Sequence, residues 1–211
     1  MSFSPNRKRS KHLLALEQVE RAITVHELFQ PPIRRETRHA AVSVVLRRQE
    51  DQTEALFILR ATTDTDPWSG HMAFPGGHYE SIDETLRHTA ERETLEEIGL
   101  DLATSGRYIG AIESVQANPR GRDLDMVVWP FVYELTDPSA EMTPNYEVAD
   151  IMWGSLDAMH TGDSHTHAEF TVGGERVEFP GYQVDDEVVW GLTYRMVDKF
   201  FALLDEDWVE R

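Results

Sequence analysis

Three glutamates at helical spacing, Glu93, Glu96 and Glu97, are the side chains of this sequence best suited to chemistry. Residues at i, i+3 and i+4 share one face of a helix, so three carboxylates would gather there and repel one another. Water can solvate such a cluster, or a cation can bind over it. Mg²⁺ and Mn²⁺ prefer carboxylate oxygens and also take the oxygens of substrate phosphates. The spacing predicts a divalent metal site, and a solvated acidic face is the competing interpretation.

The residues around this cluster favour the metal site. Pro75, Gly76 and Gly77 precede the helix, and a glycine turn lets backbone and metal approach a phosphate chain together. Arg92 comes directly before Glu93 and can pair with one carboxylate, which would orient it. The glycine turn, the three glutamates and Arg92 together predict a site in which backbone groups and a bound cation contact a phosphate.

Hydrophobic patterning predicts the elements that must position these residues. The acidic helix is expected over 83–98, with Ser81 or Asp83 as its N-cap and Gly99 at its end. The strands before and after it suggest an α+β fold, an α/β/α sandwich with a mixed central sheet. Strands are expected over 40–47 and 54–60 as a hairpin, 108–113, 126–133, 148–153, and 170–172 and 176–179 around Gly173-Gly174; further helices are expected over 10–29, 155–160 and 191–204.

The composition excludes several classes of function. The chain has 211 residues, 40% of them hydrophobic, which suits one domain with a sizeable core. Its 20 Lys and Arg against 38 Asp and Glu give a net charge of −18, which disfavours general binding to nucleic acid or anionic membranes. The absence of cysteine excludes disulfides and thiolate metal sites. No apolar run approaches the ~20 residues of a membrane span, and no signal peptide is evident, so a cytoplasmic protein is expected.

The segment 92–100, RETLEEIGL, resembles the second half of the Nudix box, in which Arg-Glu is followed by an apolar residue, Glu-Glu and Gly. Glu84 lies eight residues before Arg92, where the box has its first Glu. Asp83, however, keeps the usual spacing from Gly77. The sequence leaves open which of these two carboxylates has the family role. On these residues the chain is identified as a member of the Nudix hydrolase superfamily.

The resemblance implies a Nudix fold and a diphosphatase that uses Mg²⁺ or Mn²⁺ to cleave a nucleoside diphosphate linked to another moiety. A bound metal would lower the pKa of a water molecule, and a carboxylate would then take its proton. The base is open between Glu96, Glu97 and the later Glu147, which is otherwise a plain strand-edge charge. By role, the resemblance implies Glu93, Glu96, Glu97 and the Gly77 carbonyl as metal ligands, and Glu96, Glu97, Arg92 and Glu147 as catalytic residues.

The substrate can be narrowed by further resemblance. The segment 71–77, HMAFPGG, the longer box and the Trp-Gly-x-Thr at 190–193 are similar to the coenzyme A diphosphatase group, which implies CoA or a CoA derivative. The loop after Arg60 departs from that group, because it lacks a basic residue and contains Asp64 and Asp66, which would repel a 3′-phosphate. ADP-ribose, NADH and nucleotide sugars are alternative substrates. A nucleotide-sensing module without catalysis is a further alternative, although such modules typically lose box carboxylates.

Candidate substrate contacts lie on several loops. A tryptophan in the loop before the glycine turn is suited to stack an adenine, with simple packing as the alternative. A pair of arginines between two predicted strands is suited to contact phosphate. The candidate substrate-binding residues are Arg60, Trp68, Gly76, Gly77, Arg120 and Arg122.

Two regions are expected along the chain. Residues 1–35 form an N-terminal helical extension, and residues 36–211 form the Nudix hydrolase domain. The extension is a candidate arm for a homodimer. His160, His165 and His167 are predicted to lie in a solvated loop rather than in a metal site.

Overall fold

A mixed eight-stranded sheet forms the centre of the computed structural model, which describes residues 14–25, 37–50, 52–63, 69–117, 125–172 and 175–209. Its strands are β1 (Arg38–Gln49), β2 (Gln52–Arg60), β3 (Met72–Ala73), β4 (Gly76–His78), β5 (Gly106–Ala111), β6 (Val115–Ala117), β7 (Met126–Leu135) and β8 (Val148–Ser155). The main path runs β3-β2-β1-β7-β5, while β4 pairs with β1, β6 with β7 and β8 with β2. The pair β1–β7 is parallel and the other pairs are antiparallel.

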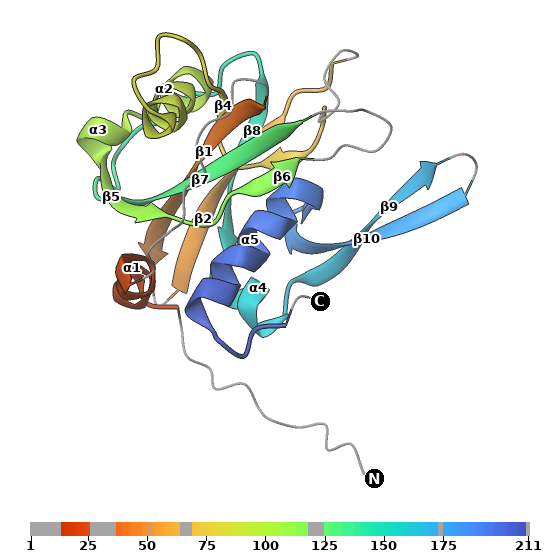
Figure 1. Cartoon of the computed structure of the whole chain (residues 1–211). Coiled ribbons are helices and arrows are strands. Elements are labelled where there is room, and N and C mark those ends of the chain that lie inside the picture. Colours follow the sequence, from red (N-terminus) through yellow and green to blue (C-terminus); the bar gives the residue numbers. More distant parts are fainter. Residues whose placement is uncertain are drawn as a thin grey trace.

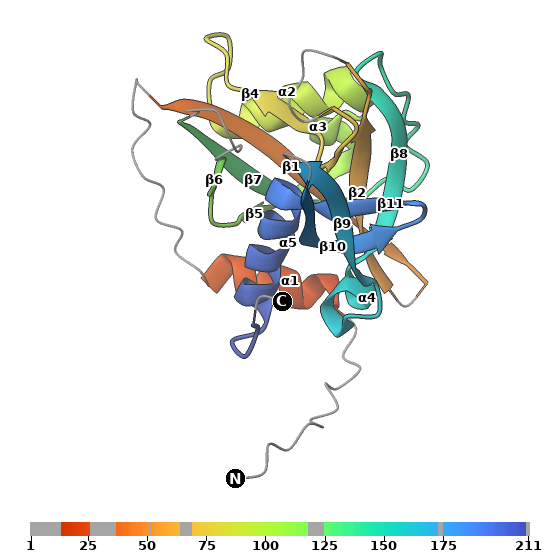
Figure 2. The ribbon, with the colours of Figure 1, turned by 90° about the vertical axis from the view of Figure 1, so that its right-hand side faces the viewer.

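Helices cover both faces of this sheet. The helices are α1 (Leu16–Val25), α2 (Leu86–Ile98), α3 (Leu102–Ser105), α4 (Leu156–Thr161) and α5 (Gly191–Leu204). A second, antiparallel sheet contains β9 (His165–Val172), β10 (Glu175–Val184) and β11 (Glu187–Trp190). Figures 1 and 2 show α2 and α3 on one side of the large sheet and α5 on the other. The predicted α+β class with a mixed central sheet is confirmed.

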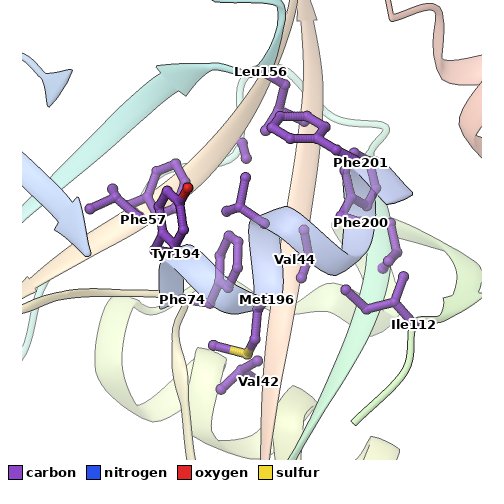
Figure 3. Packing of buried hydrophobic residues seen from close by; sticks show 14 of the residues in the cluster. Val42, Val44, Phe57, Phe74, Ile112, Leu156, Tyr194, Met196, Phe200 and Phe201 are labelled. Carbon is purple, nitrogen blue, oxygen red and sulfur yellow. The ribbon is translucent and has the colours of Figure 1, made fainter. Parts of the chain in front are cut away.

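Strand β1 shows why the sheet needs cover on both faces. Its alternating side chains divide between two buried clusters: Val42 and Val44 face the side of α5, and Ala41 and Val45 face the side of α2. A strand buried on both faces reads as a nearly continuous apolar run, as this one does. On the α5 side, the helix packs large side chains against the sheet, among them Tyr194, Met196, Phe200 and Phe201 (Figure 3).

Most predicted elements are present, and the differences have local causes. The first hairpin pairs Leu46 with Ala55, and α5 has the predicted bounds. The acidic helix begins at Leu86 rather than at 83, because the Thr85 hydroxyl caps it by accepting from the His88 N–H. Gly76 and Gly77, expected in a turn before the helix, lie in the short strand β4. The elements α3, β6 and β11 lack enough residues to give a clear sequence pattern.

The histidine-rich segment after α4 is a second difference. His165 and His167 lie in β9, where β10 pairs with them, and not in a solvated loop. His160 lies in α4, and its ring stacks on Trp208 at 5.1 Å between centroids. The histidines lie in a strand because β10 extends beyond the predicted 176–179 to Val184, and this longer strand pairs with the histidine segment.

The helix α1 packs against the rest of the same molecule. Its apolar side chains Leu16, Val19 and Ile23 are buried in the cluster that also contains α5. The Leu14 N–H donates to Oδ1 of the buried Asp157 at 2.6 Å. The same carboxylate accepts from the Thr53 N–H through Oδ2 at 2.8 Å, and the Thr53 hydroxyl donates to the Leu14 carbonyl. One buried carboxylate therefore joins the N-terminal segment to the hairpin.

Replacing Asp157 with alanine is expected to destabilise the fold by at least about 2 kcal/mol, because two buried N–H donors lose their acceptor. Urea unfolding at neutral pH measures the difference. The exposed Asp186→Ala is the matched control and should leave the midpoint unchanged. Equal midpoints for the two variants would show that Asp157 does not hold the N-terminal segment.

Candidate active site

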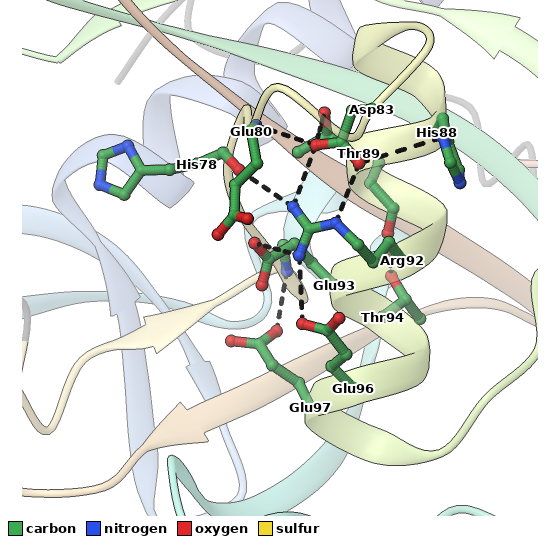
Figure 4. Close-up of polar contacts among 12 residues, drawn as sticks. His78, Glu80, Asp83, His88, Thr89, Arg92, Glu93, Thr94, Glu96 and Glu97 are labelled. Atoms are coloured by element: carbon green, nitrogen blue, oxygen red, sulfur yellow. Dashed lines mark hydrogen bonds and ion pairs between the residues drawn. The ribbon is translucent and has the colours of Figure 1, made fainter.

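The three glutamates lie on α2 (Figure 4) and differ in their exposure to solvent. The helix ends at Gly99, whose positive φ of 71° is left-handed. The Glu97 side chain is only 3% exposed, that of Glu93 is 16% exposed, and that of Glu96 is 56% exposed. The helical spacing brings the three together as predicted, but the cluster runs from solvent into the interior.

Glu97 is held at the buried end of the cluster by two groups from other elements. The Gly76 N–H donates to its Oε2 at 2.8 Å, and Arg60 Nη1 lies 3.7 Å from its Oε1. The pKa of Glu97 is raised to about 8, mainly by burial and also by the charges of Glu93 and Glu147, while the contacts with Gly76 and Arg60 oppose the rise. At pH 7 the neutral form of this carboxyl therefore predominates when no cation is bound, and a bound cation would favour the ionised form.

The two glycines are required by close approaches. Gly76 has a φ of 151° and pairs with Val42, and a Cβ there would lie 2.2 Å from the Ala41 carbonyl oxygen. A Cβ on Gly77 would lie 2.5 Å from the Glu93 carboxyl carbon. The first glycine lets β4 pair with β1, and the second lets the strand lie directly against a predicted metal ligand.

Replacing Gly77 with alanine is expected to reduce the hydrolysis rate about 100-fold, because the new methyl group pushes the flexible Glu93 carboxylate out of position. The fold should survive, and the melting temperature should stay near that of the wild type. Gly76→Ala is the contrasting variant, because its methyl group meets rigid backbone and should destabilise the protein. Full activity in Gly77→Ala would show that Glu93 does not act in the candidate active site.

Arg92 links the cluster to a buried carboxylate (Figure 4). Its Nε donates to Asp83 Oδ1 at 2.9 Å and its Nη2 to Asp83 Oδ2 at 3.0 Å. Its Nη1 lies 3.0 Å from Glu93 Oε1 and 3.1 Å from Glu96 Oε2, and Nη2 also donates to the His78 carbonyl at 3.1 Å. The guanidinium therefore fixes two glutamates of the cluster from a bidentate anchor.

Asp83, and not Glu84, is the acidic partner of Arg92. The Arg92 hydrogen bonds are the main reason that the pKa of Asp83 falls to about 2, and the Glu80 N–H and the Thr89 hydroxyl contribute. The backbone of Glu84 instead donates to His88. The expectation that Ser81 or Asp83 caps the helix is wrong, because Thr85 is the N-cap and the Asp83 carboxylate binds Arg92. That Asp83 rather than Glu84 has the family role stays a prediction, which the glycine spacing favours.

Glu147 lies at the same end of the sheet. It is exposed, immediately precedes β8, and accepts through its carbonyl from the Ala61 N–H at 2.8 Å. The charge of Glu147 is a minor cause of the raised pKa of Glu97. The geometry is compatible with Glu147 as a base, and this role stays a prediction.

The donor chemistry fits a hard divalent cation. The site offers carboxylates of graded exposure and a glycine turn against one of them. Within the described ranges, no three His, Asp or Glu side chains already surround a common metal position, and Arg92 now holds Glu93 and Glu96. The metal ligands stay predictions. Three candidate substrate contacts, Trp68, Arg120 and Arg122, lie outside the described residues.

The family model of the NUDIX domain matches residues 37–172, which include β1, the glycine turn and the whole acidic helix. The chain therefore belongs to the Nudix family. It is 30% identical over 196 residues to "Nudix hydrolase 22, chloroplastic" of Arabidopsis thaliana, covering 89% of this chain and 63% of that protein. It is 27% identical over 168 residues to "Mitochondrial coenzyme A diphosphatase NUDT8" of Mus musculus, covering 78% of this chain and 77% of that protein.

A solved structure supports the fold. A MutT/nudix family protein from Enterococcus faecalis superposes with a TM-score of 0.53 at 17% identity, covering 84% of this chain and 66% of that one. None of the helices among the described residues combines the length and the apolar character of a membrane-spanning segment. The two relatives are named for organelles, and a cytoplasmic location stays a prediction for this chain.

Proposed function

We propose that this protein is a Mg²⁺- or Mn²⁺-dependent diphosphatase acting on CoA or a CoA derivative. The observation that carries the proposal is the buried carboxyl of Glu97, bound by the Gly76 N–H and placed beside Glu93 on one helix face. Burying a carboxyl next to a second carboxylate is costly, so this placement favours a cation ligand or a base over a purely structural role.

We assign cation binding, proton transfer and side-chain orientation to different residues of the site. Glu93, Glu96, Glu97 and the Gly77 carbonyl would hold the cation, which neutralises diphosphate charge and acidifies water when bound. Water attacks one phosphorus, the bond from that phosphorus to the bridging oxygen breaks, and the two phosphate products share the added proton and hydroxyl. Glu97, or Glu96 or Glu147 in its place, accepts the proton of that water. Arg92 keeps Glu93 and Glu96 oriented during this step.

The CoA assignment is supported by the 27% identity to a protein named as a coenzyme A diphosphatase and by the HMAFPGG and Trp-Gly-x-Thr segments. Asp64 and Asp66, which would repel a 3′-phosphate, lie outside the described residues. The net charge of −18 is compatible with an anionic substrate if cations bridge the two.

A substrate panel tests the proposal. CoA, an acyl-CoA, ADP-ribose, NADH and a nucleotide sugar are each incubated with the protein and Mg²⁺ or Mn²⁺, and products are separated by chromatography. We expect 3′,5′-ADP from CoA, and no product when the metal is chelated. If ADP-ribose, NADH or the nucleotide sugar is hydrolysed and CoA is not, the proposed substrate is wrong but the proposed diphosphatase reaction stands. No hydrolysis of any compound would overturn the enzyme proposal.

A further inference from the structure

Four partly exposed aromatic rings lie together beside the candidate active site, and the chemistry above does not use them. The Trp190 ring lies 4.2 Å from the Phe170 ring, 5.5 Å from the Phe179 ring and 4.5 Å from the His71 ring, between centroids. We call these four residues the aromatic cluster. Phe170, Phe179 and Trp190 come from the consecutive strands β9, β10 and β11, whereas His71 comes from the segment before β3, which is distant in sequence.

The register of the small sheet explains why three of these rings share one face. Trp190 pairs with Gly181, which follows Phe179 by two residues, so Phe179 and Trp190 point the same way. Phe170 pairs with Val177, which precedes Phe179 by two residues, and it joins the same face. Figure 1 shows the β9–β10 hairpin extending away from the large sheet.

The segment Trp-Gly-x-Thr fixes the indole in place. Gly191 has a positive φ of 63°, which turns the chain sharply from β11 into α5. The buried hydroxyl of Thr193 donates to the Met72 carbonyl at 3.0 Å and ties the start of α5 to β3. Trp190 is thereby held against His71 at the beginning of the segment that leads to the glycine turn.

The aromatic cluster adjoins the candidate active site through the backbone pairing of His71 with Arg60. The Arg60 N–H donates to the His71 carbonyl at 3.1 Å, and the side chain of Arg60 reaches to 3.7 Å from the Glu97 carboxylate. A substrate whose diphosphate lies at Glu97 and Arg60 can thus extend along His71 toward Trp190. The region of Glu97 and Arg60 is charged and suits a diphosphate with its cation, whereas the aromatic cluster is flat and apolar and suits a planar ring.

We propose that the aromatic cluster binds the planar heterocycle at the nucleoside end of the substrate, chiefly by stacking on Trp190. The location of the diphosphate rests on the proposed function, whereas the binding of the heterocycle does not. Aromatic side chains take bases because every base has a π-face, and this attraction needs no charge on either partner. A neutral ring surface is the suitable contact for a nucleotide on a chain of charge −18.

Calorimetric titration with ADP and with inorganic pyrophosphate, both in Mn²⁺, separates stacking from phosphate binding. Trp190→Leu is expected to weaken ADP binding about ten-fold or more and to leave pyrophosphate binding unchanged. Trp190→Phe should restore most of the ADP affinity, because it restores an aromatic face. Trp153→Leu is the matched control: Trp153 is another partly exposed tryptophan, stacked on Arg47 at 4.0 Å, and its loss should not change ADP binding.

Three outcomes would overturn the inference: wild-type protein that does not bind ADP, equal weakening of ADP and pyrophosphate in Trp190→Leu, or loss of ADP affinity in Trp68→Leu alone. Thermal melting of each variant identifies unfolding. Because ADP binding is measured without turnover, the proposed function can fail separately. If the wild type hydrolyses no diphosphate but binds ADP through Trp190, the enzyme proposal falls and this inference stands.

Discussion

Glu97→Gln is expected to lower the hydrolysis rate about 1,000-fold or more, because the amide cannot take the proton of the attacking water and is a poorer cation ligand. The substitution conserves shape, and the amide oxygen can still accept from the Gly76 N–H. Initial rates on the best substrate of the panel, at saturating Mg²⁺ and then Mn²⁺, measure the effect. Glu84→Gln, an exposed carboxylate just before α2, is the control and should retain full activity.

The same variant should be more stable than the wild type when metal is absent. Burial raises the folded-state pKa of Glu97 to about 8, so folding favours its neutral form. The wild type therefore loses stability as the pH rises from about 4.5 toward 8, and a glutamine removes that loss. At pH 8 without metal, Glu97→Gln should melt higher, and added Mn²⁺ should stabilise the wild type more than the variant. Wild-type activity in the variant would contradict the catalytic assignment.

Arg92→Leu is expected to destabilise the protein by about 3–5 kcal/mol, because it leaves the buried Asp83 carboxylate without its cationic partner. It should also abolish activity, since Glu93 and Glu96 lose the group that orients them. Urea unfolding and initial rates measure the two effects. The double variant Asp83→Asn/Arg92→Leu should regain much of the stability but none of the activity, which separates folding from positioning.

The stability contributed by the Asp83–Arg92 pair is expected to decrease at acidic pH. The folded-state pKa of Asp83 is lowered to about 2 from 3.8, so the pair contributes its full stability above pH 3.8 and loses it as the pH falls toward 2. This shift corresponds to about 2 kcal/mol. The stability gap between wild type and Arg92→Leu should therefore narrow over that range. A gap that is constant from pH 7 to pH 2 would show that the two residues are not coupled.

The sequence by itself determined the features that depend on neighbouring residues. Helical spacing placed Glu93, Glu96 and Glu97 on one face, and alternation with a polar turn predicted the first hairpin. Glycine and apolar signals bounded α5, and the Nudix resemblance followed from a continuous segment. Each of these features is encoded within about 20 residues, where the periods of helix and strand are directly readable.

Only the tertiary structure decided the features that join distant segments. The depth of Glu97 depends on Gly76 from another strand, and the choice of Asp83 over Glu84 depends on which carboxylate the loop turns toward Arg92. The docking of α1 through Asp157 and the aromatic cluster also bring distant residues together. Burial and long-range pairing set pKa values and positions, and they arise from packing rather than from any local period.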